Sequence, residues 1–290
     1  MQSTQKGRSD ADVGCFMRSQ HTDDVVAYYT QRHEVRHKVF GGRKFANYGY
    51  WTREGMTMDE ASEELTDLVA RAGQIKYGDF VLDAGCGYGA NAVLCVKRYH
   101  PSRVIGIDVT DVRIAAGQQY IAECELSDVI DLRIGDATKL AFPDGSFDRV
   151  IAVECAFHFD TRRDFLREAG RVLRPGGTLA LTDMIPRRGV NPANYQKGHR
   201  AVGSGVCLEM PVNAYDADVY EGYLRASGFD QVRIESIVDK TTIPYYRMLE
   251  NIASKVDAAR ALALKTAATT LRRYVDGGED YVLVCARKAS

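Results

Sequence analysis

The stretch VLDAGCGYG, residues 81–89, decides the fold. Its apolar start is typical of a buried strand, and its three alternating glycines lead into residues that favour a helix. Glycine lets the backbone turn sharply and lets a ligand approach the chain closely. In open α/β sheets such a turn lies at the carboxyl edge of the sheet, where nucleotides bind. The stretch therefore predicts a doubly wound α/β fold that binds an adenosine-like ligand.

The sequence that follows this stretch alternates between strands and helices. Five apolar runs predict buried parallel strands, at residues 80–83, 103–108, 130–134, 148–153 and 178–183. Helical patterns lie between them, around residues 89–99, 111–126 and 161–173. Helices near 216–227 and 255–274 and strands near 231–238 and 281–286 are expected after them. Repeated strand–helix–strand units with right-handed crossovers give an open doubly wound sheet.

The chain divides into three predicted parts. Residues 1–21 are polar without an apolar period, which predicts a flexible arm. Residues 22–76 predict a helical cap whose second helix is capped by Thr57. Residues 77–290 form the α/β domain. Its irregular segment at about 186–215 is too long for a simple connection, so we expect a lid-like insertion after the fifth strand.

The composition is that of a globular protein, and it excludes several classes. Lysine and arginine number 38 against 39 aspartates and glutamates, so no global field draws the chain to nucleic acid. No apolar run reaches the roughly 20 residues of a membrane helix, and the N-terminus is polar, so we expect a cytoplasmic protein. Seven cysteines without a CxxC pair predict reduced thiols and no metal site. A homo-oligomer is compatible with these observations.

The spacing and charge around the glycines separate two kinds of cofactor. Dinucleotide-binding loops space their glycines as GxGxxG, and the helix that follows binds a pyrophosphate. Here the spacing is GxGxG. Asp83, two positions before the first glycine, would repel a pyrophosphate but suits a ligand that carries an ammonium and a sulfonium. This favours S-adenosylmethionine as the cofactor.

Two further strand ends bring carboxylates to the same edge of the sheet. Asp108 ends the second strand, about twenty residues beyond the glycines, where such folds hold ribose hydroxyls. Asp136 follows the third strand and predicts a contact with the adenine amine, while the backbone near Ala137 meets a ring nitrogen. Carboxylates on adjacent strand ends would be costly without such a ligand.

Together, these motifs resemble those of the class I S-adenosylmethionine-dependent methyltransferases that act on small molecules such as natural products, sterols and isoprenoids. The resemblance rests on VLDAGCGYG, VIGIDVT, IGDATKLAFPDGSFDRVIAVECAFHF and FLREAGRVLRPGGTLALTDM. It covers residues 79–184 closely and 216–287 loosely. It implies a seven-stranded, mostly parallel Rossmann-like sheet whose last strand is antiparallel. It also implies cofactor contacts at Asp83, Gly85, Cys86, Gly87, Asp108, Asp136 and Ala137.

Methyl transfer is an in-line displacement at the carbon bound to a sulfonium. The protein must therefore place a nucleophile opposite the leaving sulfur and take up the proton that the nucleophile loses. Three candidates follow the fourth and fifth strands: Glu154, His158 and Asp183. An ordinary histidine titrates near neutrality, which predicts His158 as general base toward a hydroxyl, with Glu154 or Asp183 orienting it. The expected reaction is therefore O-methylation of a small, partly apolar metabolite.

Methylation at carbon is the alternative. An alkene attacks the methyl group, and the resulting cation loses a proton to a carboxylate such as Glu154, with aromatic faces stabilising the charge. Sterol and isoprenoid C-methyltransferases are similar in placing a glutamate at this position and an aromatic stretch before the glycines. In that stretch, Tyr48 and Trp51 predict contacts with the methionine end of the cofactor, or else they pin the N-terminal helices to the sheet.

Weaker signals point to other chemistry. Arg187 and Arg188, with Lys197, His199 and Arg200 in the insertion, favour an anionic substrate or else form a solvated loop. HEVRH at residues 33–37 matches the HExxH pattern of zinc proteases, but the continuation that such sites require is missing. A nucleotide-dependent oxidoreductase and a non-catalytic cofactor-binding protein are the other classes that this fold allows.

Overall fold

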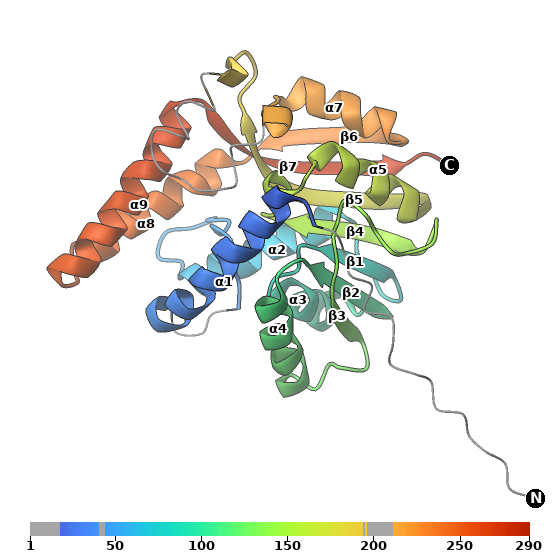
Figure 1. The fold of residues 1–290 in the computed structure, drawn as a ribbon, viewed down its shortest axis with the longest axis horizontal. Helices are drawn as coiled ribbons and strands as arrows, with labels where there is room; N and C mark the ends of the chain where they lie inside the picture. Colours follow the sequence, from blue (N-terminus) through green and yellow to red (C-terminus); the bar gives the residue numbers. More distant parts are fainter. Residues whose placement is uncertain (1–17, 41–43, 194, 196–210) are drawn as a thin grey trace, which may run out of the picture.

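A seven-stranded sheet runs through the centre of the molecule in the order β3-β2-β1-β4-β5-β7-β6 (Figure 1). The computed structural model describes residues 18–40, 44–193, 195 and 211–290. Every strand of this sheet points the same way except β7, which lies antiparallel between β5 and β6. The strands are β1 Phe80–Ala84, β2 Arg103–Asp108, β3 Ile130–Ile134, β4 Phe147–Val153, β5 Leu173–Pro186, β6 Phe229–Ser236 and β7 Glu279–Lys288. The predicted doubly wound, mostly parallel sheet is confirmed.

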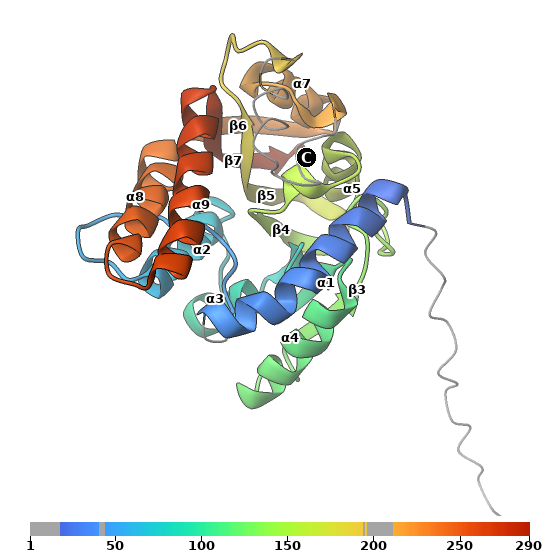
Figure 2. The ribbon, with the colours of Figure 1, turned by 60° about the vertical axis from the view of Figure 1, so that its left-hand side comes forward.

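Helices cover both faces of the sheet (Figures 1 and 2). α2, α3 and α4 pack on one face, and α5 and α7 pack on the other. α8 and α9 pack against each other and project beyond the sheet. The helices are α1 Gln20–Phe40, α2 Met58–Ala72, α3 Ala90–Tyr99, α4 Asp111–Glu123, α5 Arg162–Val172, α7 Ala217–Ala226, α8 Thr242–Ala253 and α9 Ala258–Asp276, with short 3-10 turns η1 Ala156–His158, η3 Pro211–Asn213 and η4 Val238–Lys240.

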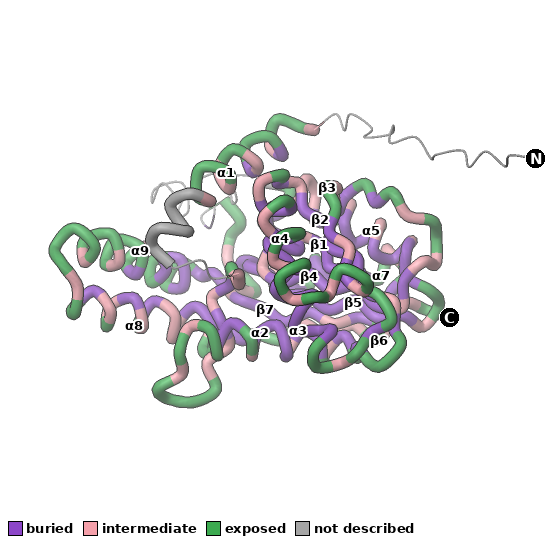
Figure 3. Tube along the Cα trace, turned by 90° about the horizontal axis from the view of Figure 1, so that it is seen from below, coloured by how far each residue is buried: buried purple, intermediate pink, exposed green. Residues whose placement is uncertain are grey.

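The central strands β1, β4 and β5 are buried on both faces, which explains why their sequences are mostly apolar (Figure 3). Successive side chains of a strand point to opposite faces. Leu82 accordingly packs in the cluster with α5 and α7, whereas its neighbour Val81 packs in the cluster with α2 and α3. The two clusters hold the parallel strands in register, so their carboxyl ends meet at one edge of the sheet.

The predicted N-terminal cap divides into two parts. α2 joins one face of the sheet, and its start is fixed by a capping box between Thr57 and Glu60. α1 crosses the carboxyl ends of the strands and packs against α4 (Figure 2). It begins at Gln20, inside the segment predicted as an arm; residues 1–17 and most of the predicted insertion lie outside the described residues.

Two elements differ from the prediction. β5 is longer than the predicted 178–183, because Leu173 pairs with β4 and the strand pairs with β7 as far as Pro186. α8 lies where the sequence pattern predicts no helix. Pro244 obscures it there, but the first turn of a helix tolerates proline because its missing N–H has no partner in that turn. Among the described residues, no helix has the length and apolar character needed to span a bilayer.

Gly170 on α5 offers a test of how the helices pack. A Cβ there would collide with the backbone oxygen of Ser227, whereas a Cβ at Gly222 on α7 would meet no atom within 4 Å. We expect Gly170→Ala to lower the free energy of unfolding by about 1–3 kcal/mol, because the backbone must shift. The matched change Gly222→Ala should raise it by about 0.5–1 kcal/mol, since alanine favours a helix. Urea denaturation measures both, and equal effects would contradict this packing.

Candidate active site

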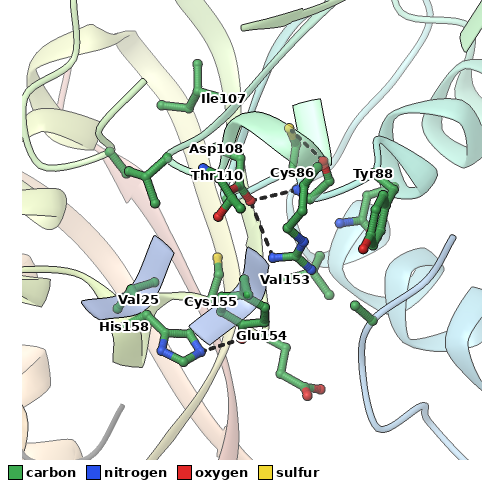
Figure 4. Close-up of a pocket in the computed structure, with 18 of the residues that line it drawn as sticks. Val25, Cys86, Tyr88, Ile107, Asp108, Thr110, Val153, Glu154, Cys155 and His158 are labelled. Carbon is green, nitrogen blue, oxygen red and sulfur yellow. Dashed lines mark hydrogen bonds and ion pairs between the residues drawn. The ribbon is translucent and has the colours of Figure 1, made fainter. Parts of the chain in front are cut away.

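A cavity opens at the carboxyl edge of the sheet, where the ends of β1, β2, β3 and β4 meet (Figure 4). The space within it, counted together with the solvent at its open mouth, is about 890 Å³. Its floor is the glycine loop at residues 85–88, and α1 covers it with Thr22, Val25 and Tyr29. Its lining includes these predicted site residues: Gly85, Cys86, Gly87, Asp108, Asp136, Ala137, Glu154 and His158.

The glycine loop has the backbone geometry that its sequence predicts. Gly85, Gly87 and Gly89 have φ of 74°, 56° and 77°, in the region that side-chain-bearing residues rarely adopt. A Cβ on Gly85 would lie 2.6 Å from the Cys155 Sγ atom, so only glycine fits there. The N–H groups of Gly85 and Cys86 donate to the carbonyl oxygen of Ile107 at 2.8 and 2.9 Å. The loop is thereby fixed to the end of β2.

Asp108 holds the next part of the cavity wall and is 6% exposed. Its Oδ2 accepts a hydrogen bond from the Gly87 N–H at 3.0 Å, and its Oδ1 accepts one from the Thr110 N–H at 2.9 Å. Nη1 of Arg113, on α4, lies 3.7 Å from Oδ2. The dashed lines in Figure 4 mark the contacts of Asp108 with the glycine loop and with this arginine.

Asp136 and Ala137 line the wall that follows β3. Oδ1 of Asp136 accepts hydrogen bonds from the N–H and the hydroxyl of Thr138, at 2.8 and 2.7 Å. These bonds fix the turn after the strand and orient the carboxylate, which is half-buried at the cavity. The predicted adenine end of the site therefore has a rigid backbone.

Asp83 is buried behind the cavity wall and does not line the cavity, in contrast to the predicted ligand contact. Its carboxylate lies next to the side-chain amide of Asn91. Burial raises its pKa to about 7; the Asn91 amide opposes this shift, and the charge of Asp108 adds to it. Asp83 is therefore a buried carboxyl behind the cavity wall that is only partly ionised near neutral pH, rather than a contact in the cavity.

Several buried polar atoms around the cavity indicate that a polar ligand is needed. Thr110 Oγ1 and Arg113 Nε are buried without a hydrogen-bond partner among the described residues, and both residues line the cavity. Buried polar groups are almost always hydrogen-bonded in native proteins. An adenosyl ligand with hydroxyl groups and a positive charge fits these atoms and the nearby carboxylates.

His158 lies in the turn η1 after β4 and faces α1 across the cavity. Its Nε2 is 2.6 Å from the hydroxyl of Tyr29, and its backbone oxygen is 3.0 Å from Nε2 of His21. Burial lowers the pKa of His158 to about 3, and the charge of Arg113 contributes in the same direction. The expected titration near neutrality is therefore wrong for this histidine, because its charged form is cut off from water.

Glu154 lines the cavity beside His158 with a left-handed backbone, at φ 52°. Its Oε2 accepts hydrogen bonds from the backbone N–H of Tyr48 and from the hydroxyl of Tyr281, both at 2.8 Å. Its own N–H donates to Thr182 Oγ1 at 3.0 Å. Glu154 thereby ties the aromatic loop to β5 and β7.

Asp183 is fully buried and does not line the cavity, although it was a catalytic candidate. Its Oδ2 is 2.7 Å from Nε of Arg162, which is also fully buried, and it accepts a hydrogen bond from the Tyr220 hydroxyl at 3.0 Å. Arg162 also donates to the backbone oxygen of Asn213 at 2.7 Å. The geometry is that of a structural ion pair joining β5, α5 and α7.

The aromatic loop reaches the cavity with different residues from those predicted. Lys44, Phe45, Ala46 and Asn47 line it, whereas Tyr48 and Trp51 do not. The Tyr48 ring stacks on Tyr245 of α8 with ring centres 4.6 Å apart, and Trp51 Nε1 donates to the Tyr48 backbone oxygen at 2.9 Å. Their packing therefore fits the other prediction, that they pin the N-terminal segment to the rest of the fold.

Arg187 and Arg188 do not line the cavity. Arg188 pairs with Asp218 at 2.8 Å where both side chains are well exposed, and the Arg187 N–H donates to Gly278. The other predicted anion-binding residues, Lys197, His199 and Arg200, lie outside the described residues. No group of three potential metal ligands occurs in the described part of the chain.

Two cavity residues carry no signal in the sequence. Tyr29 lies on α1, more than fifty residues before the glycine loop, and only the packing of that helix brings it to His158. Arg113 follows Asp108 by five positions, but nothing in the pattern of α4 distinguishes it from a surface arginine.

Known proteins similar to this chain identify its family. It is 30% identical over 258 residues to erythromycin 3''-O-methyltransferase of Saccharopolyspora erythraea, covering 84% of this chain and 83% of that enzyme. It is 31% identical over 249 residues to 27-O-demethylrifamycin SV methyltransferase of Amycolatopsis mediterranei, covering 83% and 89%. The family described as Methyltransferase domain matches residues 82–181. The chain is an S-adenosylmethionine-dependent methyltransferase.

Solved structures agree with the fold of the methyltransferase. The [4+2]-cyclase SpnF has a TM-score of 0.73 at 25% identity, covering 92% of this chain and 96% of that one. Geranyl diphosphate C-methyltransferase from Streptomyces coelicolor, solved with S-adenosyl-L-homocysteine, has a TM-score of 0.72 at 17% identity, covering 93% and 99%. The predicted family, fold and cofactor are confirmed.

Asp83→Asn is expected to change how the stability of the methyltransferase depends on pH. The pKa of Asp83 is about 7 in the folded protein and about 4 when unfolded, so the folded state binds an extra proton between these values. Its free energy of unfolding therefore falls as the pH rises through this window, by at most about 1.4 kcal/mol per unit. Because asparagine does not titrate, the Asp83→Asn variant does not undergo this decrease in the free energy of unfolding.

The measurement compares thermal melts of both cofactor-free proteins from about pH 5 to about pH 8. The stability gained by the substitution should grow as the pH rises. A difference that is constant over this range would contradict a raised pKa for the Asp83 carboxyl.

Asp183→Asn separates a structural from a catalytic role. Because it leaves Arg162 buried without its counter-charge, we expect the free energy of unfolding to fall by about 3–5 kcal/mol. Binding of S-adenosylhomocysteine to the folded fraction should be unchanged, since Asp183 does not line the cavity. Denaturant titration and calorimetry test the two statements. Normal stability with lost activity would return Asp183 to the catalytic candidates.

Proposed function

We propose that the methyltransferase transfers a methyl group to a hydroxyl oxygen of a small, partly apolar natural product, with His158 as general base. The observation that carries this proposal is a buried imidazole whose Nε2 already holds a hydroxyl, that of Tyr29, at 2.6 Å. The phenol stands where the hydroxyl of an acceptor would meet the ring. Two relatives of high coverage, named above, are O-methyltransferases of an erythromycin and a rifamycin.

The neutral state of His158 supports its role as the proton acceptor. With a pKa of about 3 in the ligand-free protein, the ring is unprotonated near neutrality and need not lose a proton first, although the same burial makes it a weaker base than an ordinary histidine. When the acceptor oxygen takes the methyl group, the positive charge leaves sulfur and passes, with the hydroxyl proton, to the imidazole. The same burial that keeps the ring neutral excludes water from competing with the acceptor.

The cofactor belongs at the glycine loop in this proposal. We assign its ribose hydroxyls to Asp108 and its adenine to Asp136 and the backbone near Ala137, with Gly85, Cys86 and Gly87 beneath it. All of these residues line the cavity that also contains Glu154 and His158. Bound there, S-adenosylmethionine would supply an electrophilic methyl group, and this chain would orient that group toward the acceptor oxygen whose proton His158 takes.

C-methylation has less support from the site. Glu154, its expected proton acceptor, already accepts two hydrogen bonds at Oε2, so this oxygen is engaged in holding the aromatic loop and β7. Glu154 is therefore better placed to hold the aromatic loop at the cavity than to take a proton. A sterol 24-C-methyltransferase of Saccharomyces cerevisiae is 30% identical over 242 residues, so the carbon reaction is tested as a separate arm.

His158→Gln and Glu154→Gln test the assignment of the base. We expect His158→Gln to lower kcat by about 10²–10⁴-fold, because glutamine preserves polarity but takes up no proton. Glu154→Gln should cost less, since its amide oxygen can still accept from Tyr48 and Tyr281. Both variants should bind S-adenosylhomocysteine like the wild type, as measured by calorimetry.

The acceptors for this assay are 27-O-demethylrifamycin SV, 3''-O-demethylated erythromycin and a sterol, together with an extract of the producing cells. Labelled S-adenosylmethionine marks the product, and NMR distinguishes an O-methyl from a C-methyl group. A C-methylated product, or full activity of His158→Gln with loss in Glu154→Gln, would overturn the proposal.

A further inference from the structure

Arg113 lines the cavity beside the glycine loop, and its side chain is nine-tenths buried. Its Nη1 lies 3.7 Å from Asp108, while its Nε is buried without a hydrogen-bond partner among the described residues. A Cβ on Gly87 would lie 3.2 Å from Nη2. The guanidinium therefore packs directly against the loop on which the cofactor rests.

Aromatic rings cover the guanidinium on its other sides. Its Cζ lies 4.3 Å from the ring centre of Tyr29 and 5.1 Å from that of Tyr88. His33, one turn beyond Tyr29 on α1, has its Nδ1 2.9 Å from the Tyr88 hydroxyl. Residues four apart on a helix share one face, so α1 rests on this spot with both side chains. We call Tyr29, His33, Tyr88 and Arg113 the α1 clasp.

We propose that Arg113 contacts the cofactor and couples its binding to the seating of α1 over the cavity. A buried N–H beside a carboxylate suits a hydroxyl group, which can donate to Asp108 and accept from Arg113 at the same time. The cofactor hydroxyls assigned to Asp108 would supply the missing partner. The proposal rests on the cofactor and on that placement. It shares one residue with the proposed base, because the Tyr29 ring that stacks on Arg113 also carries the hydroxyl that lies 2.6 Å from His158 Nε2.

The coupling follows from the geometry of the clasp. A guanidinium is planar, and its stacking on Tyr29 and Tyr88 depends on the orientation of that plane. A hydrogen bond from Nε to the cofactor fixes the orientation of this plane. The rings of Tyr29, on α1, and Tyr88 therefore pack better against the guanidinium when the cofactor is bound. By linkage, the seated helix must then strengthen cofactor binding by the same factor.

Arg113→Met tests the contact, and Arg133→Met is its matched control. The control removes an arginine of β3 that is half exposed and paired with Asp131, away from the cavity. Calorimetry measures the binding of S-adenosylhomocysteine, and hydrogen exchange of residues 20–33 measures the seating of α1. We expect Arg113→Met to weaken binding by about ten-fold or more. Saturating ligand should slow exchange of α1 in the wild type and in Arg133→Met, but not in Arg113→Met.

His33→Ala tests the coupling without touching the cavity, because His33 does not line it. The ligand should still bind, with an affinity reduced only by the lost coupling, and should protect α1 less than in the wild type. If circular dichroism shows that Arg113→Met is unfolded, His33→Ala still tests the coupling between the ligand and α1. Arg113→Lys then replaces Arg113→Met in the binding measurement.

Two results would overturn the inference. Unchanged ligand affinity in the Arg113 variants would show that Arg113 does not contact the cofactor. If the ligand slows hydrogen exchange of α1 in the Arg113 and His33 variants as much as in the wild type, ligand binding is not coupled to the seating of α1 through the clasp. Neither result bears on the O-methylation proposal, which depends on His158 and on the methylated product.

Discussion

The carboxylate of Asp108 is the constraint on which the site depends. With its two oxygens it binds the N–H of Gly87 in the glycine loop and the N–H of Thr110 ahead of α4. It also faces the guanidinium of Arg113. The loop, the second strand and the first turn of α4 thus meet at one side chain, and α1 is connected to it through the aromatic rings on Arg113. A shorter or neutral residue there would loosen all of these elements together.

Charge is distributed unevenly around the cavity, and this has a function. Asp108 places a carboxylate beside the glycine loop, where a sulfonium ligand belongs, and the buried carboxyl of Asp83 lies behind that loop. On the opposite wall His158 is kept neutral by burial. The carboxyl groups near the glycine loop favour a cationic methyl donor, and the neutral His158 provides an uncharged proton acceptor on the other wall. Transfer of a methyl group to a hydroxyl requires both.

The sequence predicts the fold and the cofactor side of the site well, because both depend on local rules. Parallel strands end at one edge of the sheet, so Asp108 and Asp136 must lie near Gly85. The same rule places Asp183 of β5 at that edge. It cannot show that Arg162 of α5 lies against Asp183 in the core and neutralises the charge of its carboxylate. Tyr29 and Arg113 meet only because α1 folds back over the sheet, and no short-range pattern encodes that contact. The pKa of His158 depends on the same burial.

The ion pair of Asp183 and Arg162 has a consequence for how such enzymes diversify. Through the backbone of Asn213 it anchors the chain where it returns to the sheet, and the bond from Arg187 to Gly278 anchors the point where it departs. Each end of the intervening stretch is thus fixed to the framework by its own contact. A change at Asp183 or Arg162 would disturb both the strand and the point at which the chain rejoins it, so these two positions can change in related enzymes only together.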